Sequence, residues 1–67
     1  MTGAVWIDYV NWRGVREGRV IEPISITWGQ NEWHKEPQWL LKAYDRKREG
    51  FREFAMSGIK EWRKHGG

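Results

Sequence analysis

Apolar and polar residues alternate along much of this chain, and a period of two residues is typical of β-strands with one buried face. The alternation predicts strands over residues 4–12, 16–28 and 38–45. A turn containing asparagine and glycine separates the first two, and the polar loop 29–37 separates the second from the third. A long second strand among shorter ones favours a sheet that curls into a small barrel.

The second extended segment is expected either to bend in its middle or to consist of two strands that meet there. Pro23 cannot donate a hydrogen bond to a neighbouring strand, so it should mark an edge, a bulge or a bend. Beyond it, Ile24, Ile26 and Trp28 share one face, which the alternation predicts to point inward. Apolar residues of the later strands are expected to complete the core, and the predicted core motif consists of Trp39, Leu41 and Phe54.

The last third of the chain permits two interpretations. A spacing of three to four residues between apolar positions suits an amphipathic helix, whereas alternation over residues 50–56 suits a strand. Gly58 would interrupt the helix near its middle, at a cost of about 1 kcal/mol. We therefore favour a strand over residues 50–56, then a short helical turn or an added strand over residues 58–62, and a frayed tail over residues 63–67.

Length and composition limit what this chain can be. Its 67 residues suffice for one small, mainly β domain, with a core over residues 4–62. There is no cysteine, which excludes disulfides and thiolate metal sites and suits a reducing cytoplasm. We expect a cytoplasmic protein without a membrane partner, because the first residues do not resemble a signal peptide and no run approaches the ~20 apolar residues of a membrane span.

Six tryptophans are many for a chain of this length. Each can bury on the order of 200 Å², but a domain this small cannot bury all six. Some should line a groove, a ligand site or an oligomer interface. Trp12, Trp33 and Tyr44 could form a surface on which bases stack, or they could anchor a protein or homodimer interface. The net charge of +3 favours anionic partners only mildly.

Residues that could support catalysis or metal binding are sparse. His34 lies in a loop with few possible co-ligands, whereas a metal site needs three or four that converge. There is no cysteine nucleophile, no glycine-rich phosphate loop and no nucleophile-elbow motif. We expect no enzyme activity, no metal and no cofactor.

Short motifs follow one another along the chain in a distinctive order: Trp6-Ile7-Asp8-Tyr9, Trp12-Arg13-Gly14, Arg19-Val20-Ile21-Glu22-Pro23, Trp39-Leu40-Leu41, Arg46-Lys47-Arg48 and Arg52-Glu53-Phe54. This order resembles that of the WYL domain family of bacterial and phage regulators. In that family a Trp-Tyr-Leu triplet is followed by a strand, a basic loop and an Arg-x-Phe motif. The resemblance extends from about Val5 to Ile59.

This resemblance implies a five-stranded Sm-like, Src-homology-3-like barrel that senses ligands, with nucleotides or nucleic-acid fragments as the expected class. It places Arg19 and Arg52 at the family's basic positions. A structural pairing of Arg52 with Glu22, Asp45 or Glu53 is the competing interpretation. Two differences bear on ligand chemistry. Leu40 replaces the tyrosine of the triplet, and the inserted residues 30–37 bring Trp33 and His34 next to it.

Three functions remain open at this stage. The first is a stand-alone, non-catalytic regulatory module that binds a protein partner or a nucleotide-type anion. The second is a protein that binds single-stranded nucleic acid through Trp12, Trp33, Arg19 and Arg52. The third is a structural module in which tryptophans close a homodimer.

Overall fold

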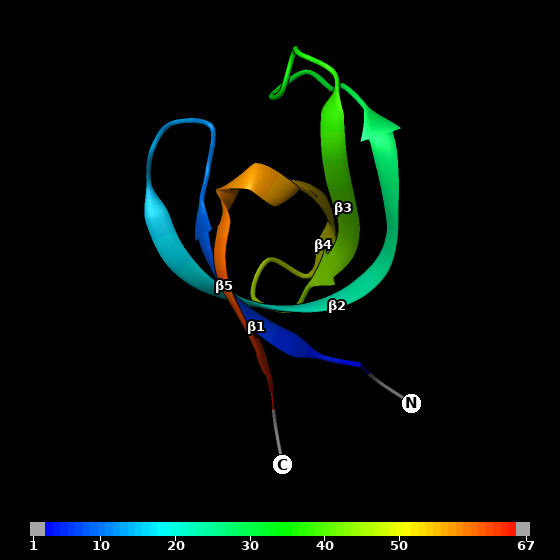
Figure 1. Cartoon of the computed structure of the whole chain (residues 1–67). Helices are drawn as coiled ribbons and strands as arrows, with labels where there is room; N and C mark the ends of the chain where they lie inside the picture. The colour runs from blue at the N-terminus through cyan, green and yellow to red at the C-terminus, as the bar shows by residue number, and fades with distance from the viewer. Residues whose placement is uncertain (1–2, 66–67) are drawn as a thin grey trace.

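In the computed structural model, which describes residues 3–65, the chain forms five antiparallel β-strands and one short 3-10 turn (Figure 1). The predicted mainly β class is therefore confirmed; the helical turn lies at residues 56–58, and the added-strand alternative is the correct one for residues 59–62. The elements are β1 (Val5–Val10), β2 (Arg16–Gly29), β3 (Gln38–Asp45), β4 (Gly50–Ala55), η1 (Met56–Gly58) and β5 (Ile59–Lys64).

The strands form one sheet in the order β4-β3-β2-β1-β5, with the long strand β2 at its centre. The first part of β2 pairs with β1, as far as Ile21 opposite Val5. From Ile21 onward β2 pairs with β3, and the register shifts between Pro23 and Ser25. This shift confirms that the regular pairing is interrupted next to Pro23, in one continuous strand. Because β2 changes its neighbour halfway along, the sheet curls (Figure 1).

Within residues 3–65, no backbone pairing joins the two outer strands of the sheet, β4 and β5. A side chain bridges part of the gap: the backbone N–H of Ala55, at the end of β4, donates to the hydroxyl of Tyr9 in β1 at 3.1 Å. The curl brings β1 and β4 together in this way, and full closure of the barrel stays a prediction.

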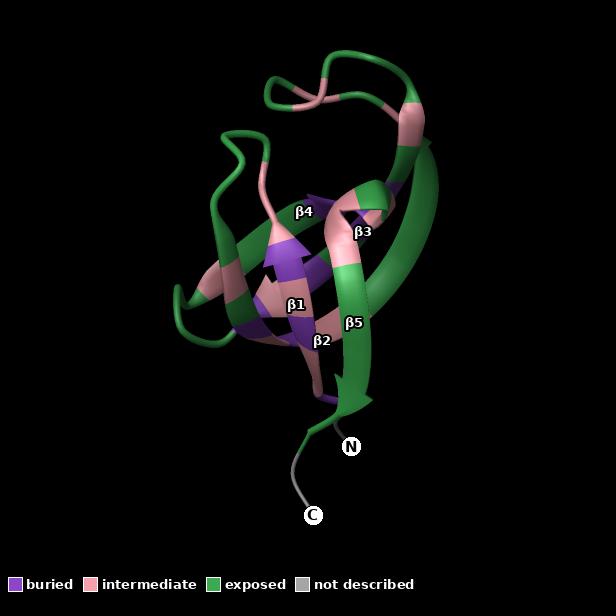
Figure 2. Cartoon of the chain, turned by 60° about the vertical axis from the view of Figure 1, so that its left-hand side comes forward, coloured by how far each residue is buried: buried purple, intermediate pink, exposed green. Residues whose placement is uncertain are grey.

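The core lies on the inner face of the curled sheet (Figure 2). It confirms two of the three predicted core residues, since Leu41 and Phe54 are buried. The prediction of Trp39 as a core residue was wrong, because its side chain is half exposed. Strand β4 pairs with β3 only from Leu40 onward, so Trp39 lies in the part of β3 that extends beyond β4. The core cluster consists of Ile7, Tyr9, Ile21, Leu41, Ala43 and Phe54.

The second half of β2 also departs from expectation. Ile26 lies opposite Leu41 and Trp28 opposite Trp39, so the side chains do lie on the inner face of the sheet. However, Ile24, Ile26 and Trp28 are all more than half exposed. The prediction that they are buried was wrong: β1 pairs with β2 only as far as Ile21, so this part of β2 extends beyond the paired centre of the sheet with a neighbour on one side only.

The C-terminal third is a strand, a turn and a strand, so the helix alternative was wrong. Gly58 does not break a helix but allows a close approach: a Cβ there would collide with the carbonyl oxygen of Val10 and lie 2.9 Å from the Tyr9 ring. The strand β5 also includes Arg63 and Lys64, which pair with β1 and so correct the predicted tail at these two positions. Residues 66–67 of that tail lie outside the described residues.

Across residues 3–65, no helix has the length and apolar character needed to span a membrane.

Candidate ligand-binding site

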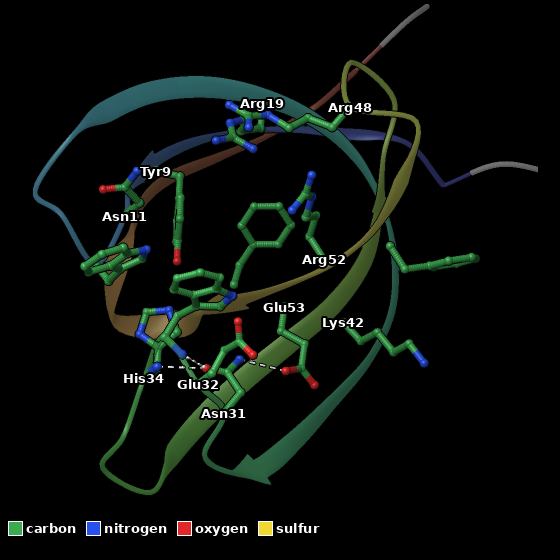
Figure 3. Close-up of a pocket in the computed structure, with 14 residues that line it drawn as sticks. Tyr9, Asn11, Arg19, Asn31, Glu32, His34, Lys42, Arg48, Arg52 and Glu53 are labelled. Carbon is green, nitrogen blue, oxygen red and sulfur yellow. Dashed lines mark hydrogen bonds between the residues drawn. The ribbon is translucent and has the colours of Figure 1, made fainter.

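A pocket of about 630 Å³ lies between the β1–β2 loop, the β2–β3 loop and strand β4 (Figure 3). This volume falls within the range that is typical of small-molecule sites. Four of the five predicted ligand residues line it, namely Trp12, Trp33, Arg19 and Arg52. These four are far apart in the sequence, and the curl of the sheet brings them together.

The fifth predicted residue, Tyr44, does not line the pocket. Its neighbours in β3, Ala43 and Asp45, are buried on the inner face, so Tyr44 lies on the outer face. There its ring packs edge-to-face against Phe51 at 5.3 Å between centroids. Tyr44 is therefore separate from the other candidates.

The two loops meet through their tryptophans. The rings of Trp12 and Trp33 are stacked, with centroids 5.4 Å apart and planes inclined by 21°. Each side chain is nevertheless about half exposed, at 56% and 52%. The guanidinium of Arg13 lies 5.9 Å from the Trp12 ring centre. The stacked rings thus offer flat aromatic surface at the mouth of the pocket.

Asn31 fixes the position of Trp33. Its side-chain oxygen accepts hydrogen bonds from the backbone N–H groups of Trp33 (2.9 Å) and His34 (2.7 Å). Its side-chain nitrogen donates to Glu53 of β4 at 2.7 Å, which ties the loop to the sheet (Figure 3). The sequence analysis missed Asn31, although asparagine in a polar loop is the signal of such a side-chain-stabilised turn.

Asn11 stabilises the turn of the β1–β2 loop that contains Trp12. Its side-chain oxygen accepts from the backbone N–H groups of Arg13 (2.8 Å) and Val15 (3.0 Å). Gly14 completes the turn with φ of +82°, a left-handed conformation that favours glycine. Each tryptophan of the stack therefore sits in a turn stabilised by an asparagine.

Arg19 is a buried, fully engaged arginine, only 8% exposed. Its Nη1 donates to Asp45 Oδ2 at 2.6 Å, and its Nε donates to Glu17 at 2.9 Å. Asp45 is completely buried, and its other oxygen accepts from the backbone N–H groups of Lys47 and Arg48 in the β3–β4 turn. Arg19 thus forms part of the pocket wall, and its charge is already compensated by Asp45 and Glu17.

Arg52 differs from Arg19 in this respect. It lies opposite Ala43, which places it on the inner face of β4, yet its side chain is exposed. Within residues 3–65 it makes no ion pair or side-chain hydrogen bond, so the competing interpretation of a structural pairing finds no support in this geometry. Arg48 lies at the same end of the pocket, with a long contact of 3.5 Å to Glu17 (Figure 3).

The opposite end of the pocket is acidic and amide-rich, with Glu32, Glu53 and Asn31 (Figure 3). Tyr9 lines the wall between the two ends, and its hydroxyl is committed to Ala55. Burial raises the pKa of Tyr9 above its ordinary value of 10.0. His34 also lines the pocket, but no three metal-ligating side chains of residues 3–65 lie close enough together to hold a metal ion.

A curled antiparallel sheet that carries an aromatic and basic pocket between its loops defines a binding module. The family model of the WYL domain matches residues 3–64, which is nearly the whole chain, and the chain belongs to the WYL domain family. Membership indicates a regulatory ligand-binding module in general. No curated protein and no solved structure matches the chain.

Proposed function

We propose that this chain is a non-catalytic regulatory module that binds a nucleotide-type anion in the pocket between its loops. One observation carries the proposal: Arg52, which has no carboxylate partner among the described residues, lines the same pocket as the stacked rings of Trp12 and Trp33. Anions with a flat ring are the ligands that suit such a combination, since guanidinium groups bind phosphate through paired hydrogen bonds and rings stack on bases.

The arginines of the pocket have different parts in this proposal. Arg19 is neutralised by Asp45 and Glu17, so it supports the wall and does not need to leave its partners. The guanidinium of Arg52 has free hydrogen-bond donors, and that of Arg48 makes only a long contact of 3.5 Å with Glu17. A phosphate is therefore expected at Arg52 and Arg48, where charge-assisted hydrogen bonds are strongest.

The base of the ligand is expected at the tryptophan pair. Stacking of a base on an aromatic side chain contributes ~1–3 kcal/mol and tolerates any base. Both rings have exposed surface at the mouth of the pocket, and the asparagine-stabilised turns hold them there before the ligand arrives. Such preorganisation lowers the entropy cost of binding.

A mononucleotide and a short single strand share this chemistry and are the two sources of ligand to distinguish. Tryptophan fluorescence, titrated with each 5′-mononucleotide and with single-stranded oligonucleotides of increasing length, separates them. Affinity that rises with strand length, together with a steep loss at higher salt, indicates a single strand, because each phosphate contact releases counterions. Affinity that is complete with a mononucleotide indicates a nucleotide sensor.

The control variant for this experiment is Arg46→Ala. Arg46 is exposed and paired with Glu22 outside the pocket, so its loss removes the same charge as Arg52→Ala without touching the site. We expect Arg52→Ala to weaken binding at least tenfold and Arg46→Ala to bind almost as wild type. Equal losses in the two variants, or no binding by the wild type at low salt, would overturn the proposal.

A further inference from the structure

The second half of β2 has an unpaired edge. Strand β3 occupies one side of β2 as far as Gly29, but β1 occupies the other side only as far as Ile21. Figures 1 and 2 both show this part of β2 at the outside of the sheet, with no strand beyond it. Residues 22–29 therefore expose backbone donors and acceptors along one side, within the part of the chain that the structure describes.

Beyond Glu22, this edge carries none of the charges that usually protect an exposed strand. In a chain with 31% charged residues, residues 23–29 contain none. Natural edge strands avoid pairing with other molecules through lysines, prolines, bulges or short length. Here a proline and a bulge occur only at the start of the segment, and the β-branched and aromatic residues that follow favour strand pairing.

The inner face of the same segment is an exposed apolar stripe. The side chains of Ile24, Ile26, Trp28 and Trp39 are 54%, 52%, 59% and 54% exposed. The Trp28 and Trp39 rings meet edge-to-face at 5.3 Å, and the register places Ile26 on the same face. A free edge and an apolar face therefore coincide along one strand.

We infer that this edge of β2 pairs with the same edge of a second copy of the chain. The two strands run antiparallel about a two-fold axis, with Ile26 opposite its counterpart in the second copy and Trp28 opposite Ile24. This register keeps Ile26 and Trp28 of both copies on one face and places Ser25 opposite Thr27 on the other. Hydroxyl pairs and aromatic–aliphatic pairs both stabilise neighbouring strands.

A second copy suits this surface better than another partner, because the segment offers no charge that would select one. The charged side chains that give the chain its net +3 lie outside residues 23–29, so two copies can meet here without bringing like charges into the contact. Charged residues are depleted and tryptophan is enriched at the centre of interfaces, as in this stripe.

The size of the surface predicts a reversible dimer. From the 150–250 Å² that a tryptophan can bury, Trp28 at 59% exposure supplies at most about 150 Å² per copy. The two isoleucines and the strand edge add to this. The total falls below the roughly 800 Å² per partner of a standard interface, in the range of weak and transient contacts.

Light scattering after size exclusion, over a dilution series, tests the inference. The wild type is expected to change from dimer to monomer on dilution, and Ile26→Lys is expected to remain a monomer throughout. Val15→Lys is the matched control, since Val15 is an exposed apolar residue far from this edge, in the β1–β2 loop. A wild type that is monomeric at every concentration overturns the inference, as does an Ile26→Lys variant that dimerises normally.

A cross-link tests the register without relying on a charged variant that could disturb the fold. The chain has no cysteine, so a single introduced thiol reports one position. Directly opposite residues of antiparallel strands have Cα atoms ~4.5–5.5 Å apart, a separation that a disulfide spans. Under oxidised glutathione, Ile26→Cys is expected to form a covalent dimer rapidly and Val15→Cys slowly. Equal rates for the two variants would contradict the pairing.

Discussion

Two pairs of tryptophans in this small domain are exposed to a similar extent and have different surroundings. Trp12 and Trp33 stack face to face among arginines, glutamates and a histidine. Trp28 and Trp39 meet edge to face beside Ile24 and Ile26, on a stretch of strand without charge. The exposure of a ring therefore does not define its role. The charge and shape around it separate a site for an anion from a surface for another sheet.

The two pairs also differ in how they are positioned. Asparagine side chains in two loops hold Trp12 and Trp33, and the loops approach each other only because the sheet curls. The register of two adjacent strands holds Trp28 and Trp39, so that pair needs no contact from the rest of the molecule. The first pair thus depends on the whole fold, and the second depends on one hairpin.

The largest expected effect comes from the buried ion pair behind the pocket. Asp45→Ala leaves Arg19 buried without its main partner, and removing one member of a buried pair costs about 3–5 kcal/mol. For a domain of this size, that loss approaches its whole stability. Urea unfolding monitored by circular dichroism measures it. Asp8→Ala, which removes the exposed pair with Arg16, should cost much less. Similar losses in the two variants would contradict the importance of the buried pair.

Substituting one tryptophan of each pair tests whether the two pairs have separate roles. Trp12→Ala should weaken nucleotide binding by ~1–3 kcal/mol, the contribution of one stacked base, and leave self-association unchanged. Trp28→Ala should weaken self-association and leave nucleotide binding unchanged. Titration and light scattering on the same preparations give both results. If either variant changes both properties, the two regions are not independent.

A smaller effect is expected from Asn31→Ala. This substitution removes the acceptor of two backbone N–H groups and the bond to Glu53, so Trp33 loses its fixed position. We expect a loss of roughly 1–2 kcal/mol in nucleotide binding, in line with a few hydrogen bonds. Gln38→Ala removes an exposed bond to Glu36 near the same loop and serves as the control. Binding that matches the wild type in Asn31→Ala would show that the loop is ordered by other contacts.

The smallest effect concerns Tyr9 and high pH. Burial raises the pKa of Tyr9 in the folded state, so the stability it contributes is fully present below pH 10.0 and is lost as the pH rises through the folded pKa. Tyr9→Phe removes the bond to Ala55, at a cost of ~0.5–1.5 kcal/mol at neutral pH. The difference in unfolding temperature between wild type and Tyr9→Phe should therefore become smaller above pH 10.0. A difference that does not change with pH would contradict this role of Tyr9.

Alternation in the sequence predicted the strands well, because it reports which residues share a face. It could not show whether that face is covered, and for this reason Ile24, Ile26, Trp28 and Trp39 were placed in the core although they are exposed. These residues lie in the parts of β2 and β3 that extend beyond the ends of β1 and β4, and where those strands end is a property of the tertiary structure.

For the pocket, the family resemblance indicated Arg19 and Arg52 without distinguishing their roles. The difference comes from Asp45, which is 26 positions from Arg19 and meets it only in the curled sheet. Trp12 and Trp33 were predicted as exposed aromatic residues, and the structure places both in the pocket. Tyr44 was grouped with them, but the alternation of β3 turns it to the outer face.

The most direct test of the account combines two variants and two measurements. Arg52→Ala and Ile26→Lys are each assayed for nucleotide binding by fluorescence titration and for mass by light scattering. The account predicts that Arg52→Ala loses binding but still dimerises, and that Ile26→Lys binds as wild type but stays monomeric. If Arg52→Ala binds with wild-type affinity, or if one variant loses both properties while remaining folded, the assignment of separate roles to the pocket and the β2 edge is contradicted.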